Sequence, residues 1–349
     1  MRVDGTISYT RLKQIGVGQG MNSTVWLADD PQLGGQVAAK EIEKSRFANP
    51  TAYFDETQAI FAVAHDNVIE VKYACQTPNL ISLVMPYYPN LSLTDRISDR
   101  PLQLSEVQRV AQGVLAGLAH IHLKGYIHFD VKPSNVLFSN KGTPMVADFG
   151  QSRAISPAGV VSVPKLYMSA QPPETINTGK ATLVADIYHV GLLIYRAANG
   201  DGFYKAQNPH PATIMTKISR GKFPDRNRFM PHVPSRIRTL IRKALRVNPD
   251  DRFQTAIEMA DDLSRVDVAL DWSVEPLPPG GFRWRAIRPG QCDLVVELRN
   301  VSGAWDVETC TEKKGEPRRA KGKKENWRSG FTLDDAYAHL EEVFERFLE

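Results

Sequence analysis

Residues 128–135 read HFDVKPSN and bring together side chains that could transfer a phosphoryl group. The carboxylate of Asp130 can accept the proton of an attacking hydroxyl. Lys132 lies two residues further along an extended segment, so it points the same way and can neutralise the transferred group. Asn135 offers the hard amide oxygen that magnesium binds, and Pro133 keeps the segment out of a helix. The spacing favours phosphoryl transfer from a catalytic loop.

A second metal ligand follows in residues 136–150, VLFSNKGTPMVADFG. Two short apolar runs separated by Asn-Lys-Gly predict a β-hairpin. The hairpin would deliver Asp148 beside Asn135, and these two oxygen donors suit magnesium together with nucleotide oxygens and water. An isolated Asp-Phe-Gly is a surface loop in most proteins, but here the HxDxKxxN pattern lies just upstream. We therefore predict that both residues bind the metal.

A glycine-rich segment, GQGMNSTVWLA at residues 18–28, lies between two strand candidates near the N-terminus. Glycines let the backbone approach phosphate oxygens and present amide hydrogens to them. We take Gly18 as the first glycine because this alignment leaves VWLA on the returning strand, although Gly16 permits an alignment shifted by two residues. On its own, such a segment is more often only a turn.

Lys40 ends the apolar strand candidate VAAK. A lysine in this position commonly extends its ammonium to the surface. A buried ammonium needs a carboxylate instead, and Glu56 on the following helical segment is the candidate partner. This pair would hold the ammonium against the α- and β-phosphates of a nucleotide.

The elements that must position these residues fall into two parts. Four strand candidates, at 24–28, 36–42, 68–74 and 80–85, and a helix at 51–64 predict a small sheet that carries one helix. A helix then begins near Ser105, which forms a predicted capping box with Gln108, and stops at Gly125. A mostly helical region continues to about Val266 and includes a buried helix at 183–198.

The C-terminal part is predicted as a separate unit. The proline- and glycine-rich run SVEPLPPGG reads as a linker. Three strand candidates, at 282–288, 292–300 and 304–311, precede a basic loop and a helix that opens at Thr332. The predicted organisation is an N-terminal tail at 1–8, a main domain at 9–268, a linker at 269–281 and a small βββα domain at 282–349.

Composition excludes several classes of protein. The 349 residues include 43 basic and 39 acidic side chains, a balance too even to indicate a polyanion-binding protein as a whole. The cysteines Cys75, Cys292 and Cys310 lie far apart and fit neither a disulfide framework nor a zinc site. No signal peptide and no apolar run of membrane-spanning length is visible. These features predict a cytoplasmic protein without a membrane partner.

From about Tyr9 to about Val266 the sequence resembles the eukaryotic-type protein kinase family. VAAK resembles its lysine strand, HFDVKPSN its catalytic loop and DFG its metal-binding motif. QPPE at 171–174 is similar to its A-P-E motif, DIYHVG at 186–191 to its central-helix motif, and Arg252 to the arginine that pairs with Glu174. Lys132 resembles the serine/threonine branch of the family. The resemblance implies an α+β bilobal fold with a small β-rich N-lobe and a helical C-lobe.

The resemblance also implies roles for single residues. Asp130 and Lys132 would be catalytic, Asn135 and Asp148 would bind Mg²⁺, and a protein serine or threonine hydroxyl would be the acceptor. Met85 would be the gatekeeper residue, followed by a hinge at 86–88. The expected ATP-binding residues are Val17, Gly18, Gln19, Gly20, Ser23, Val25, Ala38, Lys40, Glu56, Met85 and Tyr88.

Phe129 departs from the family pattern, which has arginine before the catalytic aspartate (an H-F-D variant). That arginine pairs with a phosphorylated activation loop and takes no part in phosphoryl transfer. Because every group expected to touch ATP, metal or hydroxyl is present, we predict an active kinase that needs no activation-loop phosphate. Phe129 would pack against the apolar underside of the loop.

The alternative is a pseudokinase or binding module that acts through its C-terminal unit. The loop at 311–327 carries seven basic and three acidic residues. Trp284, Trp305, Arg283 and Arg285 belong to the neighbouring strand candidates. Basic loops beside aromatic side chains can bind single-stranded nucleic acid, so a nucleic acid or protein partner is the second hypothesis.

Overall fold

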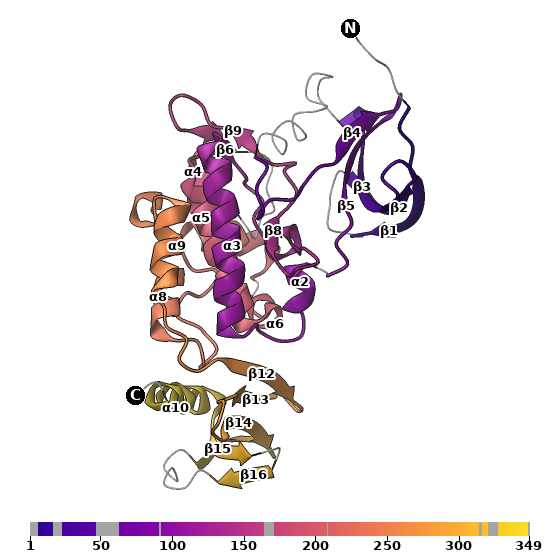
Figure 1. The fold of residues 1–349 in the computed structure, drawn as a ribbon. Helices are drawn as coiled ribbons and strands as arrows, with labels where there is room; N and C mark the ends of the chain where they lie inside the picture. The colour runs from indigo at the N-terminus through magenta and orange to yellow at the C-terminus, as the bar shows by residue number, and fades with distance from the viewer. Residues whose placement is uncertain are drawn as a thin grey trace.

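The computed structural model describes residues 6–16, 23–46, 63–90, 92–163, 171–207, 209–313, 316–319 and 327–347. Figure 1 shows a small β-sheet lobe, a helical lobe and, beneath the helical lobe, a C-terminal sheet with one helix beside it. The first two lobes confirm the predicted bilobal arrangement. The expected glycine-rich residues 17–20, Glu56 and most of the helix at 51–64 lie outside the described residues.

The N-lobe sheet is antiparallel, in the order β1-β2-β3-β5-β4. Its strands are β1 (Thr10–Ile15), β2 (Ser23–Asp30), β3 (Gly35–Glu43), β4 (Tyr73–Gln76) and β5 (Leu80–Pro86). The strands predicted at 24–28, 36–42 and 80–85 are confirmed. The prediction at 68–74 is wrong for most of its length: only its last two residues belong to β4, while Val68 makes a single bridge to Val146 of the helical lobe.

The helical lobe is built around α3 and α5. Its helices are α2 (Leu93–Arg96), α3 (Leu104–Leu123), α4 (Pro173–Thr178), α5 (Val184–Asn199), α6 (Asp201–Lys205), α7 (Pro211–Ser219), α8 (Ser235–Ala244) and α9 (Ala256–Ser264). Nearly all of α5 is buried, as its apolar sequence predicted. The predicted capping box at Ser105 is wrong. Gln103 is the N-cap of α3, and the Ser105 backbone N–H donates to Asp271 Oδ1 at 3.1 Å. A distant carboxylate thus satisfies an N-terminal amide of α3.

Short two-stranded ladders carry the catalytic and activation segments. The predicted hairpin after Asn135 is confirmed as β7 paired with β8. The ladder strands are β6 (Tyr126–Ile127), β7 (Val136–Phe138), β8 (Pro144–Val146), β9 (Arg153–Ala154), β10 (Val161–Ser162) and β11 (Lys180–Ala181). Strand β9 pairs with β6, and β10 pairs with β11. The three-residue helical turns are η1 (Lys44–Arg46), η3 (Pro133–Asn135) and η5 (Pro249–Asp251).

The C-terminal sheet has more strands than the three predicted. In the described part of the chain these are β12 (Trp272–Leu277), β13 (Gly281–Ala286), β14 (Asp293–Val301), β15 (Ala304–Lys313), β16 (Glu316–Arg319) and β17 (Arg328–Phe331), followed by α10 (Leu333–Arg346). The helix predicted to open at Thr332 is confirmed, since Thr332 is its N-cap.

The prediction of a linker at 269–281 is wrong for residues 272–277, which form β12 along the edge of the sheet. Pro276 is tolerated in β12 because an edge strand need not donate from every residue. The run that resembled a linker is therefore a strand of the C-terminal sheet.

The C-terminal sheet and the helical lobe share one continuous apolar core. The fully buried Trp284 of β13 donates its indole N–H to Nδ1 of His232 at 3.1 Å, just before α8. Arg238 of α8 forms an ion pair with Glu341 of α10, with an N···O distance of 2.6 Å. Charged and apolar contacts therefore both cross the seam between the two units.

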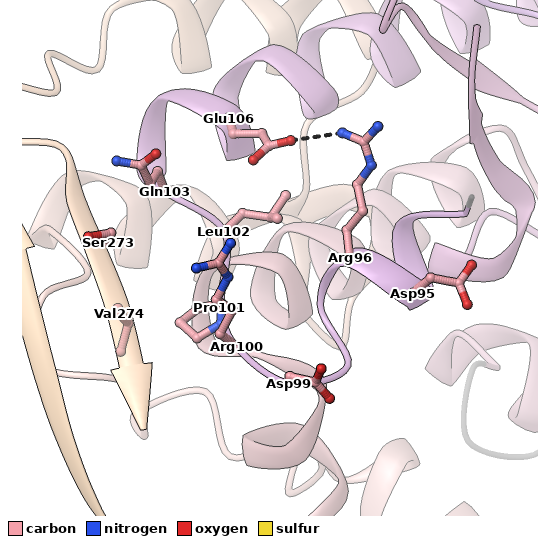
Figure 2. Close-up of a pocket in the computed structure, with 10 residues that line it drawn as sticks. All are labelled: Asp95, Arg96, Asp99, Arg100, Pro101, Leu102, Gln103, Glu106, Ser273 and Val274. Carbon is pink, nitrogen blue, oxygen red and sulfur yellow. Dashed lines mark hydrogen bonds and ion pairs between the residues drawn. The ribbon is translucent and has the colours of Figure 1, made fainter. Parts of the chain in front are cut away.

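A pocket of about 460 Å³ opens along the seam between the start of α3 and β12. Figure 2 shows Ser273 and Val274 of β12 on one side and Arg96 and Glu106 on the other. Arg96 donates to Glu106 at 3.0 Å across this space.

Among the helices of the described segments, none is both long and apolar enough to span a bilayer.

Candidate active site

The register of the N-lobe sheet places the expected nucleotide-binding residues on one face. Val25 of β2 lies opposite Lys40 of β3, and Ala38 lies opposite Met85 of β5. Cross-strand partners share a face, as do residues two apart on one strand. Ser23, two residues before Val25, joins the same set. The opposite face carries the apolar cluster of Ala28, Val37, Ala39 and Val84.

Lys40 reaches the metal-binding motif. Its ammonium donates to Asp148 Oδ1 at 2.8 Å, while only 7% of the lysine surface is exposed. Burial would raise the pKa of Asp148, but the Lys40 ammonium outweighs this effect and holds that pKa well below its usual range. The aspartate is therefore ionised at neutral pH. The predicted partner Glu56 lies outside the described residues, so the Lys40–Glu56 pair stays a prediction.

The catalytic loop gathers its three polar side chains around one carboxylate. Lys132 Nζ lies 2.8 Å from Asp130 Oδ2, and the Asn135 amide nitrogen donates to that same oxygen at 2.8 Å. It also donates to the Asp130 carbonyl at 2.8 Å. The structure thus brings together the three loop residues that the sequence singled out. Two donors on one oxygen fix the orientation of the Asp130 carboxylate and leave its other oxygen for a substrate hydroxyl.

The hairpin β7–β8 places Asp148 near Asn135. The backbone N–H of Ala147 donates to the Asn135 carbonyl at 2.8 Å, so the residue before Asp148 is fixed to the catalytic loop. Because the Asn135 amide nitrogen faces Asp130, its Oδ1 is turned the other way. Lys40 binds Oδ1 of Asp148, and Oδ2 takes no part in that bond. Hard oxygens of this kind suit a magnesium ion, and the assignment of Asn135 and Asp148 as its ligands stays a prediction.

Asp186 of α5 holds the catalytic loop from below. Its carboxylate accepts hydrogen bonds from the backbone N–H groups of His128 and Phe129, each at 2.9 Å. A ring nitrogen of His122 also hydrogen-bonds to it at 2.9 Å. Burial would raise the pKa of Asp186, but the hydrogen bonds from His122 and His189 lower it strongly. Sequence reasoning missed this role. The available signal was an aspartate inside an otherwise apolar, buried helix, since such a carboxylate requires partners.

Phe129 is buried, with 1% of its surface exposed, and adopts the left-handed backbone conformation (φ +64°). Asp186 stabilises this uncommon conformation through the hydrogen bond to the Phe129 N–H. The ring belongs to an apolar cluster, as expected for packing against the underside of the activation segment. The cluster contains Ile127, Phe129, Ala181 and Ala185, with Ile155, Val161, Val163 and Leu183 packed on it.

The activation segment is attached to the helical lobe at both described ends. Ile155 donates its backbone N–H to the Gly125 carbonyl at 2.7 Å, and Val163 donates to Gly179 at 3.0 Å. At the far end, Arg252 makes two hydrogen bonds to the Glu174 carboxylate, at 2.8 and 2.6 Å. This is the pair that the resemblance implied. Residues 164–170, including Tyr167, lie outside the described residues.

The C-terminal side chains considered for nucleic-acid binding have internal roles. Trp284 is fully buried, and Trp305 packs partly buried against the same core. Arg283 forms an ion pair with Glu297 at 2.5 Å, and Arg285 pairs with Glu312 at 2.5 Å. The prediction of a loop at 311–327 is wrong for residues 311–313, which end β15, and for 316–319, which form β16; residues 314–315 and 320–326 lie outside the described residues.

A β-rich lobe lies over a helical lobe, and a lysine, a carboxylate and two metal-ligand candidates meet at their junction, which is the arrangement of the protein kinase class. The family described as "Protein kinase domain" matches residues 9–262, and the chain belongs to that family.

The chain is similar to several curated serine/threonine-protein kinases. Serine/threonine-protein kinase PrkC of Bacillus subtilis is 26% identical over 269 residues, which are 75% of this chain and 40% of that protein. PknL of Mycobacterium tuberculosis is 28% identical over 284 residues, 79% of this chain and 70% of PknL. PknB of Mycolicibacterium smegmatis is 30% identical over 262 residues, 72% of this chain and 42% of PknB. The chain thus matches well under half the length of two of these relatives.

Proposed function

We propose that this chain transfers the γ-phosphoryl group of ATP to a serine or threonine hydroxyl of a protein. The observation that carries the proposal is the pair of donors, Lys132 Nζ and the Asn135 amide, that fix one oxygen of Asp130. A base held in this way is ready to accept a proton. The names of the serine/threonine-protein kinases to which the chain is similar support the choice of acceptor.

Each residue has a distinct task in this mechanism. Lys40 positions the α- and β-phosphates, Asp130 accepts the hydroxyl proton, and Lys132 neutralises charge on the transferred group. Asn135 and Asp148 would hold magnesium. When bound, this ion neutralises the nucleotide phosphates.

Asp130→Asn tests the assignment, because the carboxylate acts on the hydroxyl and not on ATP. We expect phosphate transfer to a protein mixture to be lost while Mg-ATP affinity stays at the parent value. Asp261→Asn changes an exposed aspartate of α9 and is the matched control. It should retain both phosphate transfer and Mg-ATP affinity. Parent-rate transfer by Asp130→Asn, or loss of its ATP affinity in a folded protein, would contradict the mechanism.

We also propose that the enzyme needs no phosphate on its activation segment. The support is the apolar cluster around Phe129, which occupies the place where an arginine would await a phosphate. The backbone bonds of Ile155 and Val163 attach the segment without one. The cluster itself offers a phosphate no cation, so the candidate partners within the segment are Arg153 of β9 and Lys165.

Protein made without any phosphate should therefore be active at once. Changing Ser152, Ser156, Ser162 and Ser169 to alanine should alter the rate on an external substrate by less than about tenfold, or about 1.4 kcal/mol of barrier. Phe129→Arg should lower activity because it buries a charge in an apolar cluster, whereas Phe129→Leu, the matched control, should retain most of it. A phosphate-free enzyme that stays inert until its activation segment is phosphorylated would refute this proposal without touching the catalytic assignment.

A further inference from the structure

Four cationic side chains line a pocket of about 500 Å³ on the helical lobe. Lys222 and Arg226 come from the segment after α7, Arg242 from the last turn of α8, and Arg246 from just beyond it. The one carboxylate that lines the pocket is Asp225. Four positive charges against one negative charge leave the lining strongly basic.

Arg226 is fixed beneath this pocket by the surrounding fold. Its Nε and Nη2 atoms are buried and have no hydrogen-bond partner. Its carbonyl accepts a hydrogen bond from Arg242 Nε at 3.0 Å. The guanidinium lies close against Gly221, where a β-carbon would come within 3.0 Å of Nη1. The glycine, in the left-handed conformation at φ +67°, thus makes room for the buried charge.

Among the described residues, none of the four cations forms an ion pair with a carboxylate. Ion pairs in the surrounding described region use other residues: Arg238, Lys243 and Arg252. Burial lowers the pKa of Arg226, the interaction with Tyr188 opposes this effect, and the charges of Arg252 and Arg246 lower the pKa further. A partly buried cation among like charges is costly unless an anion balances it. The pocket at the seam differs, because its Arg96 already pairs with Glu106.

We propose that this pocket is a binding site for a tetrahedral oxyanion, the phosphate group of a phosphorylated ligand. Lys222 and Arg246 are exposed and can contact the phosphate directly. Arg226 and Arg242 supply charge that the fold holds in place. Guanidinium groups match phosphate geometry with paired hydrogen bonds, and the volume suits a small ligand or a phosphorylated side chain. Inorganic phosphate and a phosphoserine side chain share this chemistry.

Calorimetric titration distinguishes these two sources. The active site is first filled with magnesium and a non-hydrolysable ATP analogue, so that it cannot take up the probe. Inorganic phosphate is titrated in one arm, and a phosphoserine peptide with its unphosphorylated form in the other. Saturable binding of either phosphate-bearing probe is expected, and the tighter probe identifies the source. If neither probe binds once the active site is filled, the proposal is wrong.

Substitutions locate the site. Arg246→Gln should weaken phosphate binding at least tenfold. Arg236→Gln, the matched control, changes an exposed arginine of α8 that does not line the pocket, and should bind like the parent. Equal affinities for the two variants would overturn the assignment.

Arg226→Gln separates a binding role from a structural one by thermal unfolding. Without phosphate, its midpoint should equal or exceed that of the parent, because a buried charge without a counter-ion is removed. The rise in midpoint that phosphate gives the parent should be absent. A variant that still gains the full rise from phosphate would overturn the role of Arg226.

Discussion

Trp284→Ala should destabilise the helical lobe as well as the C-terminal sheet. The indole is fully buried, lies 5.5 Å from the Phe344 ring between centroids, and donates to His232 of the helical lobe at 3.1 Å. Truncating a buried tryptophan costs about 3–5 kcal/mol. This is a large part of the roughly 5–15 kcal/mol that stabilises a typical domain. Trp284→Phe keeps a ring but leaves His232 Nδ1 without its donor, so we expect a smaller loss of about 1–3 kcal/mol.

Hydrogen exchange in increasing concentrations of urea can follow both units at once. Amides of α5 report on the helical lobe, and amides of β14 report on the C-terminal sheet. Because the apolar core is continuous, both sets should lose protection together in Trp284→Ala. Trp305→Ala, a partly buried tryptophan of the same sheet, is the control and should affect β14 more than α5. Unchanged protection of α5 in Trp284→Ala would refute the reasoning and show that residues 272–349 fold independently.

Three further predictions concern buried titratable side chains. Burial lowers the pKa of His232 to about 3, so the folded protein keeps it neutral while the unfolded chain binds a proton below about pH 6.5. This stability is fully present above that pH and is lost as the pH falls towards 3. The loss of stability amounts to about 2 kcal/mol by pH 5, at about 1.4 kcal/mol per pH unit. In urea titrations, the dependence of the free energy of unfolding on pH should therefore differ between the parent and His232→Asn. Arg252→Ala should cost about 3–5 kcal/mol in thermal or urea unfolding because it leaves the Glu174 carboxylate without its partner, whereas Glu174→Gln with Arg252 intact should cost less. Lys40→Met should raise the pKa of Asp148 and weaken ATP binding, whereas Asp148→Asn should raise the magnesium concentration needed for half-maximal rate; unchanged titrations would contradict these roles.

The sequence alone was sufficient to predict the loop that carries Asp130 and the hairpin that precedes Asp148. Asp130, Lys132 and Asn135 lie within six residues, so local backbone geometry nearly fixes their mutual positions. The turn chemistry of Asn-Lys-Gly marks the hairpin that carries Asp148. The buried helix α5 was equally visible, because its apolar residues cover every side.

The contacts between distant segments were decided only by the tertiary structure. Three such contacts join residues that no sequence period relates. They are the bond of Asp271 to the start of α3, the bond of Trp284 to His232, and the cluster of cations around Arg226. Strand β12 was hidden for a second reason: the proline-rich run that includes its end signals a linker, yet an edge strand accepts Pro276 once a neighbouring strand is present to pair with. Local motifs are determined by the residues that compose them, whereas a seam or a charged pocket exists only after the chain has folded, because its residues come together only then.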